Sequence, residues 1–372
     1  MDSIIGYEVD FLRVGENSKS GDAIAIRYRL RDASRRERYE VMIVDGGDQK
    51  AGQALVDHVR YVYKTERVEH VVNTHPDADH CAGLSVVLQE LDVGTLWMHQ
   101  PWNYAADILA RVLDGRHTPN SIEKRLRGKL SAADRLEQIA EENGIPVRSP
   151  YRGERIGPFW VLSPDEDWYV DELVPYFKDM PEIDEDEGDQ EHLDEGQLWG
   201  KNVKSAADWV SEDWYNETLP AVAVEPRMEN ESSVILWGDF NEDKVLLTGD
   251  AGPEALTRAL DTLTVSRINP CTNLKLTQLP HHGGRHTVTP TILDRLLGPI
   301  RAPTSRSNVC AVACVAKESE RPRRVVANAY TRRGARVHTT RDCRGFWYRR
   351  DMPERQNVSV QNPLGLFDKV EA

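Results

Sequence analysis

Four side chains that commonly bind metal ions occupy six consecutive positions of this chain: His75, Pro76, Asp77, Ala78, Asp79 and His80. The apolar run 68–73 before them predicts a strand, and the run 82–91 after them predicts a helix. In an extended turn, residues two apart point the same way, so His75, Asp77 and Asp79 would converge while Asp79 and His80 diverge. Divergence suits two metal positions. Imidazole nitrogen favours Zn²⁺, and carboxylate oxygen extends the choice to Mn²⁺.

Two further groups of potential ligands follow predicted strands. Asp250 comes directly after Gly249 at the end of the run 244–248, where a carboxylate could bridge two cations. The pair His281 and His282 follows the run 274–279, and the two glycines after the pair let backbone approach a substrate closely. Each group alone is a weak signal. Three strand ends that carry only good metal ligands together predict a metal centre.

The order of strands and helices points to one α/β fold. Strands are expected at 7–14, 23–29, 39–44, 68–73, 96–99, 159–162, 221–224, 233–237, 244–248, 274–279, 311–315, 325–327, 336–339 and 345–349. Helices are expected at 53–64, 82–91, 131–143, 253–260 and 290–297. This mixture predicts two sheets between layers of helices within a single domain, 1–372. The turn Asp45-Gly46-Gly47 is expected to shape the pocket.

An acidic, weakly periodic stretch at 165–213 interrupts this pattern and is interpreted as an insertion. It is either a solvated loop or a lid or docking surface for a protein partner. Trp199, Trp209 and Trp214 around it could stack on a base, although packing against the body is the more ordinary role. Four other histidines could support a site or fill the core: His99, His117, His286 and His338.

Composition narrows the setting. No apolar run approaches the roughly 20 residues that cross a bilayer, and the N-terminus lacks a basic segment followed by an apolar one, so no membrane association and a cytoplasmic location are expected. A formal net charge of -14 disfavours broad adhesion to nucleic acid. The arginine-rich stretch 321–350 could still form a local basic face. Five scattered cysteines argue against a disulfide framework.

Several short motifs, in their order and spacing, carry a family resemblance. They lie at 21–24, 44–47, 74–80, 162–164, 230–236, 247–250, 279–284, 337–339 and 345–347. Over residues 14–348 the chain resembles the metallo-β-lactamase superfamily, and more closely the hydrolase domain of the ComEC DNA-uptake proteins. The resemblance implies a four-layer αββα sandwich and a hydrolase that depends on one or two divalent ions.

The resemblance also implies roles for individual residues. His75 and Asp77 would bind one ion, and Asp79, His80 and His281 a second. Asp250 would bridge the two ions. Asp79 could also act as a base, and His282 would orient a leaving group or phosphate unless it exchanges roles with His281. Arg285 and His286, directly after the glycine pair, are candidates for substrate contact.

Two departures from the family pattern weaken the first ion's site. Asp77 stands where most of the superfamily has histidine. No histidine follows a strand at 164–230 except His192, which lies in the acidic stretch. Asn230 is the candidate substitute.

The leading functional hypothesis is a phosphodiesterase or nuclease in which a divalent ion lowers the pKa of water toward about 7. One alternative is a hydrolase of the same fold that acts on an ester, lactone or thioester. The other is a metal-stabilised binding or regulatory protein with reduced catalysis.

Overall fold

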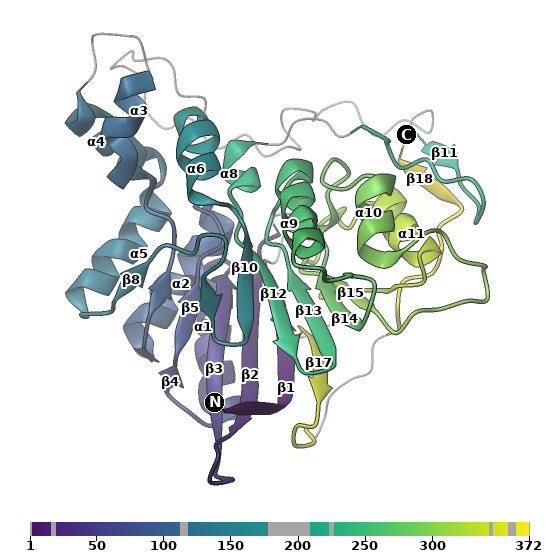
Figure 1. Cartoon of the computed structure of the whole chain (residues 1–372), viewed down its shortest axis with the longest axis horizontal. Coiled ribbons are helices and arrows are strands. Elements are labelled where there is room, and N and C mark those ends of the chain that lie inside the picture. Colours follow the sequence, from purple (N-terminus) through teal and green to yellow (C-terminus); the bar gives the residue numbers. More distant parts are fainter. Residues whose placement is uncertain are drawn as a thin grey trace.

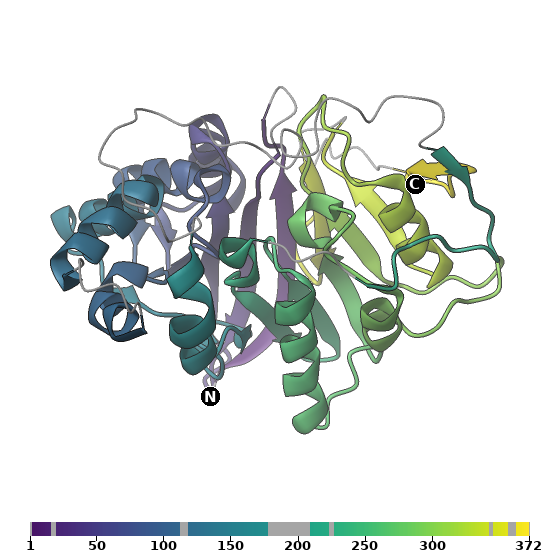
Figure 2. The ribbon, with the colours of Figure 1, turned by 90° about the horizontal axis from the view of Figure 1, so that it is seen from above.

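Two seven-stranded sheets pack face to face, and helices cover the outer face of each (Figure 1, Figure 2). The computed structural model describes residues 2–15, 20–111, 118–177, 209–222, 227–341, 345–355 and 362–371. The arrangement is the four-layer αββα sandwich of mixed α/β class, so the predicted fold class is confirmed.

The first sheet mixes an antiparallel half with a parallel half. Its strand order is β17 (Gly345–Arg350), β1 (Ser3–Leu12), β2 (Ala23–Arg31), β3 (Glu37–Gly46), β5 (His70–Val72), β7 (Leu96–Trp97) and β8 (Val147–Arg148). Neighbours are antiparallel from β17 to β3 and parallel from β3 to β8. The parallel half places the carboxyl ends of β3 and β5 at one edge, where the first predicted motif begins.

The second sheet has the same design. Its strand order is β16 (Arg336–Thr339), β15 (Cys310–Ala313), β14 (Leu274–Gln278), β13 (Asp243–Leu247), β12 (Ile235–Phe240), β10 (Phe159–Ser163) and β9 (Arg155–Ile156). The strands β13, β14, β15 and β16 run parallel, and the remaining neighbours are antiparallel. The ends of β13 and β14 therefore carry the second and third motifs side by side.

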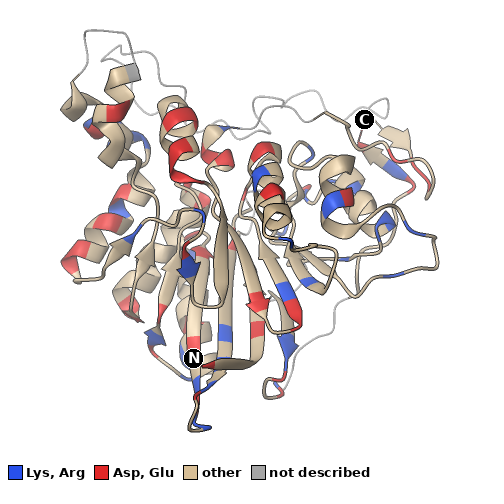
Figure 3. Ribbon diagram, in the orientation of Figure 1, with Lys and Arg blue, Asp and Glu red and all other residues tan. Residues whose placement is uncertain are grey.

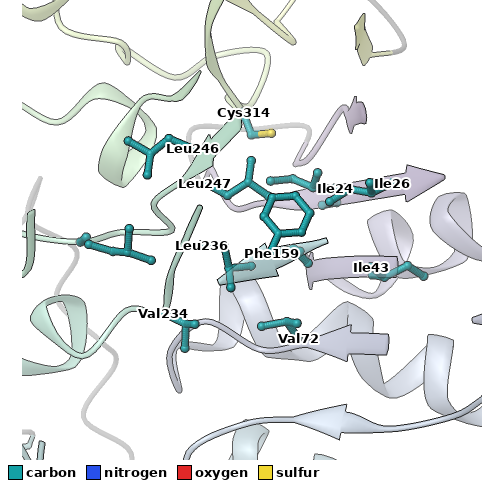
Figure 4. Close-up of a cluster of buried hydrophobic side chains, with 14 of the residues drawn as sticks. Ile24, Ile26, Ile43, Val72, Phe159, Val234, Leu236, Leu246, Leu247 and Cys314 are labelled. Atoms are coloured by element: carbon teal, nitrogen blue, oxygen red, sulfur yellow. The ribbon is translucent and has the colours of Figure 1, made fainter. Parts of the chain in front are cut away.

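Apolar side chains fill the space between the sheets (Figure 4). Ile24 and Ile26 from β2 face Phe159 of β10 and Leu236 of β12, and all four are buried. Strands that are covered on both faces need near-continuous apolar sequence, which explains runs such as 41–44. This core fixes the relative position of the two sheet edges.

Within the part of the chain that the structure describes, six helices cover the two sheets. The first sheet is covered by α1 (Gln49–His58), which continues as the π-helical turn η1 (Val59–Tyr63), and by α2 (Ala78–Glu90) and α5 (Ser131–Glu142). The second is covered by α9 (Pro253–Val265), α10 (Pro290–Leu297) and α11 (Arg324–Arg332). Local sequence sets their ends: Thr289 caps α10 by accepting a hydrogen bond from the Ile292 amide, and Pro290 occupies its first turn.

The remaining elements are short. They are β4 (Arg67–Val68), β6 (Asp92–Val93), η2 (Pro101–Tyr104), α3 (Ala105–Arg111), α4 (Pro119–Lys129), α6 (Glu166–Trp168), η3 (Tyr169–Leu173), η4 (Val174–Tyr176), β11 (Trp209–Ser211), α8 (Met228–Glu231), η6 (Pro280–Gly283) and β18 (Lys369–Glu371). Acidic side chains are prominent on α5, α6 and α9 (Figure 3).

One predicted strand is wrong. Residues 325–327 belong to α11, because Val325, Val326, Ala329 and Tyr330 recur at helical spacing and are buried together. The β-branched pair alone suggested a strand, and the longer period decides the structure. Of the strand predicted at 221–224, residues 221 and 222 form a bend and the rest lie outside the described residues.

The predicted insertion is described only at its two ends. Residues 178–208, including His192 and Trp199, lie outside the described residues, as does the proposed docking surface there. Trp209 packs under the Arg324 guanidinium, 4.8 Å from its ring centre. The Trp214 indole donates a hydrogen bond of 2.7 Å to the Arg301 carbonyl. Both tryptophans thus pack against the body of the domain.

Candidate metal centre

The first motif does not form an extended turn throughout. His75 and Asp77 follow β5 in irregular backbone, but α2 begins at Ala78, so Asp79 and His80 stand in its first helical turn. His75 Nε2 lies 3.9 Å from Asp77 Oδ2, as the alternation rule anticipates. Because α2 begins between Asp77 and Asp79, the alternation rule does not extend to Asp79, and the convergence of all three side chains stays a prediction. Asp79 is half-buried.

Four buried side chains converge beside the strand ends of the two sheets. They are Asp22, His80, Asp250 and His282. Each offers one ligand atom, and these atoms lie within 4.8 Å of one another. Asp250 Oδ1 is 3.4 Å from His80 Nε2 and 3.5 Å from His282 Nε2. On the other side of the His282 ring, Nδ1 is 3.6 Å from Asp22 Oδ1. Such a set matches the N and O donors that divalent ions take.

Asp45, at the end of β3, orients the His80 imidazole. Its Oδ2 accepts hydrogen bonds from His80 Nδ1 at 2.8 Å and from the Thr74 hydroxyl at 2.6 Å, and its Oδ1 accepts one from the Thr74 amide. With Nδ1 held in this way, His80 presents Nε2 to Asp250. Carboxylates that orient ligating histidines in this manner strengthen metal sites. Asp45, His75 and His80 also form a second group of potential ligands.

Gln278 connects three of the segments. Its Oε1 accepts hydrogen bonds from the amides of Thr248 and Gly249, just before Asp250. Its Nε2 donates to Asp22 Oδ2 at 2.6 Å. One neutral side chain at the end of β14 thereby positions carboxylates that are far apart in sequence.

The histidine pair adopts unusual backbone angles. His281 has φ 49° and ψ 46°, and His282 has φ 56° and ψ 19°, so both are left-handed. Non-glycine residues rarely adopt this region, and such residues cluster at functional sites. Both rings lie near Asp250, with His281 Nε2 3.6 Å from Oδ2.

The electrostatics of the cluster are strongly coupled. Burial would raise the pKa of Asp250, but His282, His80 and His281 hold it well below its usual value. Burial would lower the pKa of His80, yet Asp250 and Asp45 raise it well above the usual value. For His282, Asp250 and Asp22 likewise overcome burial and raise the pKa. Burial and the Arg321 charge place the pKa of His281 well below its usual value.

A divalent ion suits these residues. Several buried atoms lack a hydrogen-bond partner among the described residues: Asp22 Oδ1, His75 Nε2, His80 Nε2, Asp250 Oδ1, His282 Nδ1 and His282 Nε2. Buried polar atoms without partners are costly and call for an explanation such as a bound ion. The atoms come from four segments and face one another, so one cation could satisfy several of them.

The predicted residues are placed unevenly. His80, Asp250 and His282 meet in the group of four, and His75 lies beside them, with its ring centre 4.2 Å from that of His80. His281 and Asp77 flank the group, and Asp79 is in neither group. Asn230 is fully buried in α8. Arg285 and His286 are half-buried, and the charged groups that affect Arg285 are Glu371 and Arg323.

Sequence reasoning assigned no ligand role to Asp22 or Asp45. Asp45 was expected only to shape the pocket. Asp22 lies inside the motif 21–24 that carries the family resemblance, so its position held a signal that residue type and local spacing did not reveal. Both carboxylates flank the antiparallel pair β2 and β3, which joins residues 23 and 46.

No family model matches the chain, and no curated protein does either. Among solved structures, it is similar to a β-lactamase domain protein from Burkholderia ambifaria, with 16% identity over 72% of this chain and 65% of that one and a TM-score of 0.31. It is also similar to a long form RNase Z from yeast, with 11% identity over 91% of this chain and 41% of that one and a TM-score of 0.38. The chain spans less than two thirds of either protein.

Helices in the described residues lack the combined length and apolar character that a bilayer crossing requires.

His99 is a core histidine and gives a pH-dependent prediction. Its ring stacks on Tyr169 and lies tilted beside Tyr151, and burial lowers its pKa to about 3. A folded-state pKa below the unfolded value of about 6.5 means that stability is lost as the pH falls from about 6.5 toward 3, by about 1.4 kcal/mol per pH unit. At pH 5, wild-type protein should therefore lose about 2 kcal/mol more than His99→Phe, relative to pH 7.5.

Urea unfolding of both proteins in a chelator, at both pH values, measures this difference. Equal pH dependence in the two proteins would show that His99 does not titrate in this range.

Proposed function

We propose that this chain is a metal-dependent hydrolase that cleaves phosphodiester bonds of nucleic acid or nucleotides. The observation that carries the proposal is the convergence of four potential ligands beside the strand ends of the two sheets. They are Asp22, His80, Asp250 and His282. The phosphodiester class rests on the sequence resemblance to ComEC-like domains, and arginines near the site agree with an anionic substrate. Arg321 donates a hydrogen bond to the His281 carbonyl, and Arg227 pairs with Asp77.

The four converging side chains would hold the ion, with Zn²⁺ as the first candidate and Mn²⁺ as the second. When bound, a divalent ion lowers the pKa of water toward about 7 and stabilises negative charge on the attacked group. His282, rather than His281, is the proposed ligand, because its ring lies between Asp22 and Asp250. The resemblance implies His75 and Asp77 as ligands of a further ion.

The protein residues keep the ligands fixed and manage protons. Asp45 keeps the proton of His80 on Nδ1, so that Nε2 can bind the ion. Gln278 keeps Asp22 beside His282. Asp79 remains the proposed base on the family resemblance, and it stands half-buried in the first turn of α2. His281 would then be available to orient the phosphate.

A side-by-side assay tests the substrate class. Chain stripped by a chelator and reloaded with Zn²⁺ or Mn²⁺ is offered bis-p-nitrophenyl phosphate, a short single-stranded DNA, a cyclic nucleotide and a lactone. We expect metal-dependent hydrolysis of at least one phosphodiester and none of the lactone. Hydrolysis of the lactone alone would favour the ester-type alternative, and a metal-loaded chain with no activity would favour a binding protein.

Asp79→Ala separates two roles of that residue. If Asp79 acts as a base, the variant keeps its bound ion and its KM, while kcat falls by about 100-fold or more. Loss of the ion in Asp79→Ala would instead make Asp79 a ligand.

A further inference from the structure

Arg227 forms an ion pair with a residue that was expected to bind metal. It lies directly before α8, and its Nη2 donates a hydrogen bond of 2.7 Å to Asp77 Oδ2. The Asp77 side chain is 11% exposed and that of Arg227 is 44% exposed. Charge-assisted contacts of this kind are the strong hydrogen bonds of proteins. The carboxylate is thus already neutralised by a cation that belongs to the chain.

The other potential ligands of a first ion are weak. His75 offers Nε2, which lies 3.9 Å from the oxygen that Arg227 occupies. Asn230, the candidate substitute for the missing histidine, is fully buried, and its amide atoms have no hydrogen-bond partner among the described residues. A neutral amide is a poor ligand for Zn²⁺, which prefers thiolate, imidazole and carboxylate. His75 also belongs to the second group with Asp45 and His80, but Asp45 accepts hydrogen bonds from His80 and Thr74, and His80 belongs to the group of four. One imidazole and two engaged carboxylates do not make a tight site.

The Arg227 guanidinium occupies the position beside Asp77 where a first ion would bind. A divalent cation at Asp77 would either displace the guanidinium or lie within a few ångströms of it, where like charges repel. The two cations therefore compete for Asp77. A guanidinium keeps its charge at all relevant pH values and matches phosphate oxygens in shape.

We infer that the centre holds a single ion, at Asp22, His80, Asp250 and His282, and that Arg227 replaces the first ion. Paired with Asp77, the partly exposed guanidinium supplies the second positive charge and contacts an anionic oxygen of a tetrahedral phosphate group. The inference rests on the proposed function, which places one divalent ion at these four residues.

Metal stoichiometry tests the replacement. Zn²⁺ per chain is measured after equilibrium dialysis for wild type, Arg227→Ala, Arg227→Lys and a control, Arg258→Ala. Arg258 pairs with Glu254 on the surface of α9, so its removal tests the loss of an arginine elsewhere. We expect one ion in wild type, Arg227→Lys and the control. Arg227→Ala should bind an additional ion at Asp77, because that carboxylate is released. The additional ion should bind at least tenfold more weakly than the ion at the group of four.

Two ions of similar affinity in wild type, or one ion in a folded Arg227→Ala, would overturn the inference and leave the proposed function intact. No ion in any variant would refute the proposed function, and the inference with it. Circular dichroism verifies folding, and Arg227→Lys carries the test if Arg227→Ala is unfolded, since a second ion in the lysine variant contradicts charge replacement.

Anion binding provides an independent readout. Chains loaded with one equivalent of Zn²⁺ are titrated with inorganic phosphate in a calorimeter. The Kd should rise at least tenfold in Arg227→Ala and less in Arg227→Lys, while Arg258→Ala stays at the wild-type value. Equal Kd values for wild type and Arg227→Ala would show that Arg227 does not contact the anion.

Discussion

Asp250→Asn should lower Zn²⁺ affinity by about 100-fold or more and hydrolysis of bis-p-nitrophenyl phosphate by about 1000-fold or more. Asp250 contacts His80, His281 and His282 with its two oxygens, so it is the common neighbour of the cluster. An amide keeps the shape of the side chain and removes its charge. Calorimetric Zn²⁺ titration and initial rates measure the two effects.

Asp239→Asn is the matched control. Asp239 is an exposed acid on β12 that pairs with Lys244, so the same substitution there should change neither measurement. If Asp250→Asn retained wild-type affinity for Zn²⁺, the ion would not lie at the group of four, and the proposed site would be wrong.

Arg332→Met should destabilise the domain by about 3–5 kcal/mol. Arg332 of α11 and Glu212 form an ion pair of 2.9 Å in which both side chains are 0% exposed. Glu212 also accepts hydrogen bonds from Asn328 and from the amide and hydroxyl of Thr218. Removal of the arginine leaves a buried carboxylate without its cation. Urea unfolding of metal-free protein measures the loss.

The double variant Arg332→Met with Glu212→Gln tests the cause. Because the second change removes the uncompensated charge, the pair should be more stable than Arg332→Met alone. The exposed pair of Arg31 and Glu37 is the control, and Arg31→Met should destabilise the protein far less than Arg332→Met. Equal losses for the buried and the exposed pair would contradict a role for burial.

Local patterns were sufficient to predict the layers of the fold and the strand ends that carry ligands. The groups of potential ligands that follow apolar runs contain His80, Asp250 and His282, which the fold brings together because the ends of parallel strands lie close to one another. The same reasoning does not extend to Asp79. It treats the motif as extended, whereas α2 begins at Ala78, within the motif.

The residues that sequence could not assign owe their places to distant pairing. Asp22 precedes β2 and is held beside His282 by a hydrogen bond from the Gln278 side chain, 256 positions away from Asp22. Arg227 reaches Asp77 across 150 positions, with no local motif around it. Periodicity describes neighbours along the chain, so contacts of this kind emerge only when both sheets are in place.

The ligands of the proposed centre are divided between the two halves of the sandwich. Asp22 precedes β2 and His80 stands on α2, which packs on the first sheet, while Asp250 and His282 follow strands of the second. An ion bound there would link the two halves through its ligands. Occupancy would then add its binding free energy to the cohesion of the sandwich. We expect removal of the ion by a chelator to weaken the packing between the two sheets. Proteases should then cleave both halves at an increased rate.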